Sequence, residues 1–354
     1  MRPVLAVDFL RVFFSLLLAK IQLWWYRLST AVKSIVVLYK LPDQTIESFL
    51  KSYEMFEHDA VTEDTEYEDH TISYYTVLNH LCAIGEVEKM YIPPLIDETV
   101  GVFDNQMLFE QKMAADLELP PNSKILDVGC GRGRVAAHVS RLTGAHVYGI
   151  NIDRTQIENA QNNATLTGLP HKLTFSVNNF NDPLPFPDEH FDGLYQVQVL
   201  TYAKDKEALF AEMFRVLKPG AKLSFLDWVK LPAYDDDNAH HRHLISRVKP
   251  LIGAVDTPSP EELSTTLEKV GFKVTFSGDA SVSGHQAELI VKADTFFTIL
   301  NKMINTLVAI KILPKHFKTL FDRLTKDGDA FIEADRLGIF TTSYQTIAQK
   351  PLKA

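Results

Sequence analysis

Cysteine is nearly absent from this chain, since Cys82 and Cys130 are the only two among 354 residues. Cys130 lies inside a glycine-rich turn, where a disulfide would distort the backbone. The sequence therefore excludes a disulfide-stabilised secreted domain, and we expect a reducing compartment. Metal-ligand spacings, a phosphate-binding P-loop and internal repeats are absent as well. His240 and His241 follow three acidic residues, but a solvated loop explains this group better than a metal site does.

A long hydrophobic run is also missing from the first 40 residues, where at most eight uncharged residues follow one another. A transmembrane helix needs about 20 apolar residues, and Asp8 and Arg11 interrupt the apolar core that a signal peptide would need. The segment carries six Lys or Arg against one acid, and aromatic residues at 24–26. We therefore expect residues 1–41 to be a basic amphipathic helix in a membrane interface. A helix packed on the protein's own body is the alternative.

Positive charge is scarce over the rest of the sequence. The net charge is -9, which excludes a general attraction for nucleic acid. Seven acids fall between positions 57 and 70, so we expect an acidic linker over 42–73. A helical section over 74–120, broken at Pro93 and Pro94, is expected to cover a ligand pocket.

Glycine is concentrated in the segment 125–133, which has the sequence ILDVGCGRG. A buried strand, a glycine-rich turn and the start of a helix follow one another here, as at the nucleotide-binding corner of a doubly wound sheet. Three alternate glycines follow Asp127, whereas a dinucleotide site needs G-x-G-x-x-G with a small residue in place of Arg134. The spacing therefore favours S-adenosylmethionine over NAD.

Strand and helix patterns alternate after this turn. Strands are expected at 146–150, 173–177, 191–199 and 222–228, and helices at 135–142, 154–166 and 206–217. The predicted fold class is α/β, with a doubly wound Rossmann-like sheet over 121–232 and an α+β acceptor-binding region over 233–354. In the latter region, apolar residues from Phe296 to Val308 recur at helical spacing, which is typical of a core helix or of the wall of a lipid pocket.

Four segments resemble class I S-adenosylmethionine-dependent methyltransferases, and three more resemble the sterol C-methyltransferases within that class. The former are 125–133, 147–151, 191–192 and 214–220, and the latter are 227–229, 234–235 and 348–351. The resemblance runs from about Tyr74 to the C-terminus. It implies S-adenosylmethionine as the cofactor and a sterol or related lipid as the acceptor.

The resemblance also implies which residues hold the cofactor. Asp127 would accept from its amino group, while the turn glycines allow close approach. Asn151 takes the place of the carboxylate that most relatives offer to the ribose, and Asn179 would face the adenine amino group. Caps of helices or turns are the alternative roles of both asparagines. The full predicted set is Asp127, Gly129, Gly131, Gly133, Asn151, Gln156, Asn179 and Phe180.

The acceptor half departs from the methyltransferases that act on sterol side chains. Residues 84–94 contain no tryptophan where those enzymes have an aromatic, tryptophan-rich box, and Gln198 and Tyr202 stand where they have Glu and His. Methylation of an alkene leaves a carbocation, which a neutral Gln198 neither stabilises nor deprotonates. Methylation beside a ring ketone passes through an enol and suits neutral donors. The predicted catalytic residues are Gln198, Tyr202 and the loop residue His285, for which a plain surface role is the alternative.

These observations predict a membrane-associated C-methyltransferase that acts at A-ring C-4 of a 3-keto sterol. Methylation at C-24 of the sterol side chain, methylation of another small lipid, O-methylation and non-catalytic lipid binding are the alternatives. We expect the protein at the cytoplasmic face of an intracellular membrane, such as the endoplasmic reticulum, held by residues 1–41. The sequence leaves homo-oligomer formation open.

Overall fold

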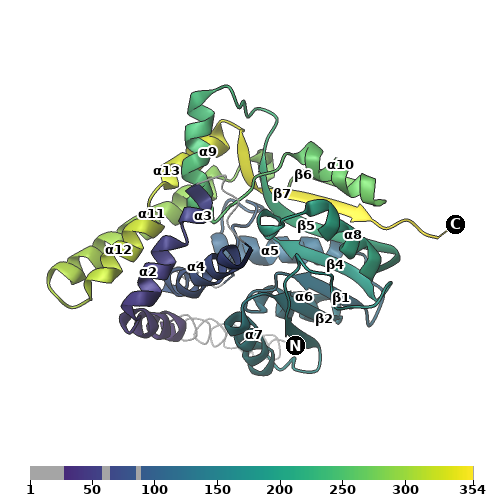
Figure 1. Ribbon diagram of the computed structural model, residues 1–354, viewed down its shortest axis with the longest axis horizontal. Coiled ribbons are helices and arrows are strands. Elements are labelled where there is room, and N and C mark those ends of the chain that lie inside the picture. The colour runs from purple at the N-terminus through teal and green to yellow at the C-terminus, as the bar shows by residue number, and fades with distance from the viewer. Residues whose placement is uncertain (1–27, 58–63, 85–88, 354) are drawn as a thin grey trace, which may run out of the picture.

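A seven-stranded sheet forms the centre of the computed structural model, which describes residues 28–57, 64–84 and 89–353 (Figure 1). Its strand order is β3-β2-β1-β4-β5-β7-β6. The first five strands are parallel, and β7 runs antiparallel between β5 and β6. The strands are β1 Lys124–Val128, β2 His146–Asn151, β3 Leu173–Val177, β4 Phe191–Val197, β5 Leu217–Lys230, β6 Lys273–Asp279 and β7 Phe340–Gln349.

Helices cover both faces of the sheet and extend beyond it. The first set comprises α2 Asp43–Lys51, α3 Glu54–Glu57, α4 Asp64–Ile84, α5 Val102–Asp116, α6 Arg134–Thr143, α7 Arg154–Leu166 and α8 Lys206–Val216. The second comprises α9 Ala239–Ile252, α10 Pro260–Val270, α11 Ala287–Ala309, α12 Lys315–Leu324 and α13 Gly328–Arg336. This architecture confirms the predicted Rossmann-like α/β class.

The side chains of β1 show how the two faces are built. Leu126 and Val128 point to the face covered by α8 and α10, while Ile125 points to the face covered by α5, α6 and α7. Successive side chains of a strand alternate between faces, so a strand buried on both sides is apolar at nearly every position. Residues 125–128 are all buried, including Asp127.

Short polar residues fix where several helices begin. The Asp205 carboxylate accepts from the backbone N–H of Ala208 at the start of α8, and Asn238 and Ser259 cap α9 and α10 in the same way. Such caps satisfy backbone donors that the first turn of a helix leaves without partners. Because each cap fixes the residue at which its helix begins, it also fixes where the preceding loop ends.

The expected linker over 42–73 is largely helical, which corrects the sequence interpretation. Phe49 of α2 and Phe56 of α3 are buried against Tyr74 of α4, with Phe49 and Tyr74 rings stacked at 6.1 Å. The seven acids between 57 and 70 favoured a linker because the sequence pattern there is dominated by charge. Residues 1–27 lie outside the described part of the chain; residues 28–39 are helical.

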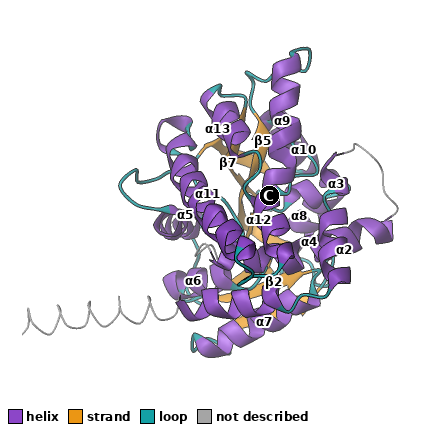
Figure 2. Ribbon diagram, turned by 90° about the vertical axis from the view of Figure 1, so that its left-hand side faces the viewer, coloured by secondary structure: helices purple, strands orange, loops and turns teal. Residues whose placement is uncertain are grey.

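The C-terminal region adds two strands to the same sheet and a group of helices at one end of it. In Figure 1, α11 and α12 extend to the lower left, away from the strands, and Figure 2 views this end of the molecule. Within the described residues, no helix is long and apolar enough to cross a bilayer. The same residues contain no group of three or more His, Cys, Asp or Glu placed to hold a metal ion. His240 and His241, expected in a solvated loop, instead lie in the first turn of α9, which Asn238 caps.

Packing of α2 against α4 predicts a measurable contribution to stability. Phe49→Ala should lower the free energy of unfolding by about 3 to 5 kcal/mol, because it leaves a cavity beside Tyr74. Leu166→Ala, at a side chain that is 83% exposed, is the control and should change stability by less than about 0.5 kcal/mol. Urea unfolding of the full-length protein measures both. Equal, small effects would mean that α2 lies outside the folded body.

Candidate active site

A ligand groove lies where the carboxyl ends of β1, β2 and β4 meet. The backbone passes from β1 to β2 on one side and returns to β4 on the other, and ligands bind at such a switch point in doubly wound sheets. Two adjoining hollows share Met90, Gly129, Gly131, Gln156 and Val197 as lining residues. They form one continuous groove, whose larger part encloses about 800 Å³.

Asp127 lines the inner end of this groove. Its carboxylate is buried and accepts a hydrogen bond from the Tyr195 hydroxyl at 2.8 Å. Burial raises the pKa of Asp127 to about 7, against the opposite effect of the Tyr195 hydrogen bond and with a contribution from Glu110. The remaining lone pairs of this carboxylate can still accept hydrogen bonds from an ammonium group of a ligand.

The glycine turn brings backbone close to the groove at two positions. Gly129 has φ +78°, and a Cβ there would lie 2.6 Å from Val199 Cγ2. Gly131 has φ +51° and lines both parts of the groove. Gly133 serves packing instead: it precedes α6, and a Cβ would lie 2.6 Å from the Phe175 ring. Gly133 is therefore not one of the residues that line the groove, and its predicted contact with a cofactor stays a prediction.

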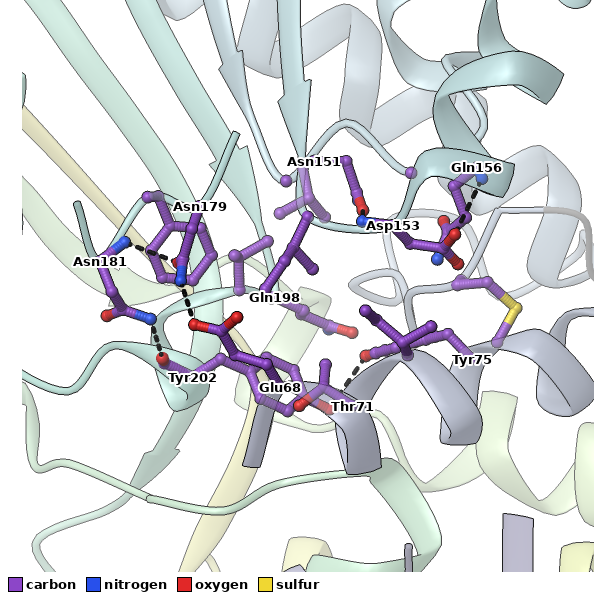
Figure 3. A pocket seen from close by; sticks show the side chains of 18 residues that line it. Glu68, Thr71, Tyr75, Asn151, Asp153, Gln156, Asn179, Asn181, Gln198 and Tyr202 are labelled. Carbon is purple, nitrogen blue, oxygen red and sulfur yellow. Dashed lines mark hydrogen bonds between the residues drawn. The ribbon is translucent and has the colours of Figure 1, made fainter. Parts of the chain in front are cut away.

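A buried carboxylate oxygen faces the middle of the groove, two residues after Asn151 (Figure 3). Asn151 Oδ1 accepts from the backbone N–H of Asp153 at 2.8 Å, as the predicted turn-capping alternative requires. Asp153 Oδ1 accepts from the N–H groups of Thr155 and Gln156 and caps α7. Asp153 Oδ2 is buried without a hydrogen-bond partner among the described residues. It is placed to accept from ligand hydroxyls, the role that the sequence analysis assigned to Asn151.

The outer end of the groove lies under α4. Asn179 Nδ2 donates to Glu68 Oε1 at 2.6 Å, and Asn179 Oδ1 accepts from the backbone N–H of Asn181 (Figure 3). Phe180 and Gln156 line the groove beside them. Asn179 therefore caps a turn and lines the groove together, and its contact with an adenine stays a prediction.

Asn79, also on α4, adds a second buried acceptor. Its Nδ2 donates to the Tyr75 carbonyl at 2.6 Å, while its Oδ1 is buried with no partner among the described residues and lines the part of the groove that contains Asp127. An acid, an amide oxygen and a glycine turn thus surround the inner end. The groove fits S-adenosylmethionine. The amino group of this cofactor needs hydrogen-bond acceptors, which the inner end of the groove offers, and its ribose hydroxyls need acceptors such as Asp153.

A second cavity joins the groove and has an apolar wall. Together with space open to solvent it measures about 1030 Å³, and Met90, Tyr91 and Gln198 line both spaces. Aromatic and aliphatic side chains from α4, β5, α9, α11 and α13 line it, among them Tyr74, Leu78, Trp228, Leu251, Phe297 and Phe331. Small-molecule sites typically have mostly apolar walls with a few polar groups, and this wall suits a lipid.

One carboxylate, Asp294 of α11, lies in this apolar wall. Burial and the nearby Asp329 raise its pKa above the usual range for an aspartate. No hydrogen bond or ion pair reaches its carboxylate from the described residues. The backbone of Gly328 passes close to it, since a Cβ at Gly328 would lie 2.0 Å from Asp294 Oδ1. Asp294 lines the apolar cavity only, so it lies beyond the junction with the groove.

Of the three predicted catalytic residues, Gln198 and Tyr202 line the same groove and His285 does not. Gln198 lies at the junction, but its amide is bonded to backbone: Oε1 accepts from Ile92 N at 3.0 Å, and Nε2 donates to the carbonyls of Ile92 and Thr342, both at 2.8 Å. Tyr202 lines the groove and donates to the Gly253 carbonyl at 2.7 Å. His285 is not a lining residue of either space, and its side chain is 52% exposed.

Sequence reasoning missed Asn79, Asp153 and Asp294. Asp153 had a signal, because an acid two residues before Thr155 and just after a strand is typical of a helix cap at the mouth of a site. Asp294 interrupts the apolar stripe of α11, which marks a polar group placed in an apolar wall. No sequence pattern indicated Asn79, since its position at the groove depends on how α4 lies over the sheet.

The bonding of Gln198 predicts that a carboxylate is tolerated poorly there. Gln198→Glu removes the donor shared by two carbonyls and sets a charge against them, at a side chain that is 5% exposed. Stability should fall by about 2 to 4 kcal/mol near neutral pH, and part should return in acid, where the introduced carboxyl regains a proton to donate. Thermal unfolding at both pH values measures this. The control is Gln161→Glu at an exposed position; similar effects in both variants would contradict the assigned role.

Comparisons with known protein families agree with this geometry. A methyltransferase domain model matches residues 126–225, and a sterol methyltransferase C-terminal model matches residues 293–352. A sterol 24-C-methyltransferase of Aspergillus fumigatus is 29% identical over 263 residues, which are 68% of this chain and 69% of that protein. Squalene methyltransferase 1 of Botryococcus braunii is 30% identical over 254 residues, 70% of this chain and 67% of that protein.

Solved structures share the fold. The cyclopropane synthase MmaA2 of Mycobacterium tuberculosis aligns with a TM-score of 0.62 at 15% identity, over 74% of this chain and 90% of that protein. A geranyl diphosphate methyltransferase in complex with S-adenosylmethionine aligns with a TM-score of 0.54 at 18% identity, over 74% and 98%. The family models and the relatives of 29% and 30% identity show that the protein uses S-adenosylmethionine as its cofactor and belongs to the sterol methyltransferase family.

Proposed function

We propose that this enzyme adds a methyl group to a carbon–carbon double bond of a sterol or related isoprenoid lipid, with the C-24 alkene of the sterol side chain as the favoured acceptor. The observation that carries this proposal is the aromatic-lined apolar cavity, which meets the cofactor groove at Met90 and Gln198. The names of the sterol 24-C- and squalene methyltransferases support an alkene acceptor. A-ring C-4 of a 3-keto sterol, the expectation from the sequence, has no such support.

The polar groups at the junction also favour an alkene over an enol. An enol mechanism needs a hydrogen-bond donor on the oxygen that becomes negative. Both amide hydrogens of Gln198 are already donated to backbone carbonyls, and the Tyr202 hydroxyl donates to Gly253. Neither residue offers its hydrogen to an oxyanion without breaking a buried bond.

Aromatic faces supply what a carbocation requires. S-adenosylmethionine provides an electrophilic methyl group, so that a carbon–carbon bond forms as its carbon–sulfur bond breaks and the neighbouring acceptor carbon becomes cationic. The rings of Tyr74, Trp228 and Phe297 line the cavity and stabilise positive charge through their π faces. The apolar wall keeps bulk water from adding to the cation, and a single water molecule at the junction takes up a proton from a neighbouring carbon, which yields the methylated alkene.

Asp294 gives the acceptor an orientation. Because it lines the cavity but not the cofactor groove, a hydroxyl bound to it lies away from the reacting carbon. A sterol has its hydroxyl on the A ring and its side-chain alkene at the other end. A sterol hydroxyl donated to Asp294 therefore directs the alkene toward Met90 and Gln198, whereas methylation at C-4 would place the A ring there instead.

The N-terminal helix connects this chemistry to a membrane. Residues 28–39 expose Val32, Val36 and Tyr39 and carry Lys33 but no acid. An amphipathic helix of this composition binds an anionic bilayer interface, which supports the predicted association through 1–41 and a location on the cytoplasmic face of the endoplasmic reticulum. Residues 1–27, including the aromatic cluster at 24–26, lie outside the described part of the protein.

The raised pKa of Asp127 predicts that cofactor binding depends on pH. Below about pH 7 the carboxyl of the cofactor-free enzyme is protonated and no longer accepts from an ammonium group, so the Kd for S-adenosylhomocysteine should rise as pH falls from about 8 to about 6. Asp127→Asn should weaken binding by about ten- to a hundredfold and remove this dependence. Calorimetric titration measures both. Asp237→Asn, in an exposed loop, is the control, and a flat wild-type profile would contradict the role of Asp127.

Acceptor preference tests the proposed reaction. Wild-type enzyme, labelled S-adenosylmethionine and detergent-solubilised sterols should give a methylated product from a Δ24 sterol and none from a 3-keto sterol with a saturated side chain, as followed by mass spectrometry. Asp294→Asn should raise KM for the Δ24 sterol about tenfold or more with little effect on kcat, since it loses a hydrogen bond to a charged group.

A 3-deoxy Δ24 sterol is the matched control, because it has no hydroxyl for Asp294 and should be converted equally by both forms. Product from the ketone alone would overturn alkene methylation. Turnover of neither sterol would instead favour another small lipid, an O-methyl acceptor or a non-catalytic lipid-binding role.

A further inference from the structure

Exposed apolar side chains gather at one end of the molecule. In the described part of the protein, eleven of the eighteen large apolar residues that are exposed lie within 28–39 or 296–312. We call the second group the hairpin face, because it follows α11 into its turn toward α12. Its members are Phe296, Ile299, Met303, Ile310 and Ile312, with exposed fractions from 48% to 60%.

The hairpin face adjoins the buried side of α11. Phe297 lines the acceptor cavity, and Leu300 and Ile304 pack into a buried cluster with Phe317 of α12. Phe296, Ile299 and Met303 lie three or four residues apart on the neighbouring side, which is exposed. Large apolar side chains that gather on an exposed surface mark an interaction site, so this side calls for a partner.

Charge identifies the chemistry of that partner. From 295 to 321 the sequence contains no Asp or Glu, although the whole protein has 45 acids and a net charge of -9. The same stretch contains four lysines, at 302, 311, 315 and 318, and all four are exposed. Lys318 forms an ion pair with Asp322, the next acid along the chain. Exposed apolar residues edged by lysines and free of acids are complementary to an anionic lipid surface.

The N-terminal helix adjoins this surface. His316 Nε2 lies 2.9 Å from the Leu38 carbonyl, and Leu38 is buried in one cluster with Phe317. Residues 28–40 also lack acids, and they add Lys33 and Lys40. In Figure 2, which views this end, α11 and α12 lie toward the viewer. Two acid-free segments far apart in the sequence thus meet at one end of the molecule.

We propose that the hairpin face docks on an anionic lipid bilayer and brings the acceptor cavity to the membrane from which the lipid acceptor is taken. This inference rests on the proposed lipid acceptor and adds a second membrane contact to the N-terminal one. The inner side of α11 supplies Ile290, Ala293 and Phe297 to the cavity wall, so the helix that touches the bilayer also lines the acceptor's site. A lipid leaving the bilayer along α11 reaches the cavity without crossing water.

A probe at one residue tests the contact directly. Met303→Cys in the full-length protein is labelled with an environment-sensitive nitrobenzoxadiazole fluorophore, and Leu166→Cys on α7 is the control, because its side chain is also exposed, at 83% against 59% for Met303, but lies outside the hairpin face. Burial raises the pKa of both native thiols, Cys82 and Cys130, which keeps them from reacting with the label.

Vesicles of phosphatidylcholine with phosphatidylserine are then added without cofactor or acceptor. We expect a blue shift and a rise in emission at position 303, a weaker response to phosphatidylcholine alone, and no change at position 166. No change at 303 while the protein sediments with the vesicles would overturn the proposal, as would failure to bind vesicles. A change at 303 that follows protein concentration instead of lipid would assign the face to a second copy of the protein and would also overturn it.

A variant with negative charge introduced on the hairpin face measures how much this face contributes to membrane binding. Ile299→Glu with Met303→Glu should reduce co-sedimentation with anionic vesicles about tenfold or more, while the matched pair Leu142→Glu with Leu166→Glu should not. Methyl transfer to a detergent-solubilised acceptor should be unchanged in both, because neither pair lines a pocket. If the wild-type enzyme shows no methyl transfer to any acceptor, the proposed function is contradicted. The vesicle results then decide the inference about the hairpin face separately.

Discussion

The side-chain amide of Gln198 joins segments that are far apart in sequence, and the arrangement of both pockets depends on it. The amide holds the backbone of Ile92, in the segment before α5, against that of Thr342 in β7. The backbone N–H of Gln198 donates to the carbonyl of Leu226 in β5. The residue adopts φ 55°, a left-handed conformation unusual outside glycine, which turns its amide back across the sheet edge. The junction of cofactor groove and acceptor cavity is built around this amide.

A neutral residue at the junction fits the distribution of charge in the site. The carboxylates of Asp127 and Asp153 line the cofactor groove, and Asp294 lies in the acceptor cavity beyond the junction. A charge at Gln198 would be buried between backbone carbonyls, at a cost that burial of an unpaired carboxylate always carries. The carboxylates therefore lie on either side of a junction that Met90, Tyr91 and Gln198 line without a charge.

The sequence predicted the sheet well because its strands and helices are local patterns. The expected limits of α7 and β3 match the structure, and those of β4 and α8 differ by at most two residues. The cofactor end was predictable for the same reason, since Asp127, Gly129 and Gly131 lie in one turn. The helices within 42–73 were missed because acids mask the buried Phe49 and Phe56. The roles given to Gln198 and His285 needed the position of β7 and of the 281–286 loop, which no local pattern encodes.

The two reactants differ in polarity, and the fold separates the surfaces that they approach. The groove is edged by Glu68, Asn179 and Asn181 under α4, a polar rim that suits a charged nucleoside. The cavity is edged by Phe297 and Leu324 between α11 and α12, which suits a lipid. Because the two spaces meet where Met90, Tyr91 and Gln198 line both, each reactant reaches the junction through surroundings of its own polarity. The same division places the lysine-edged hairpin at the end of the molecule where α11 lines the acceptor cavity.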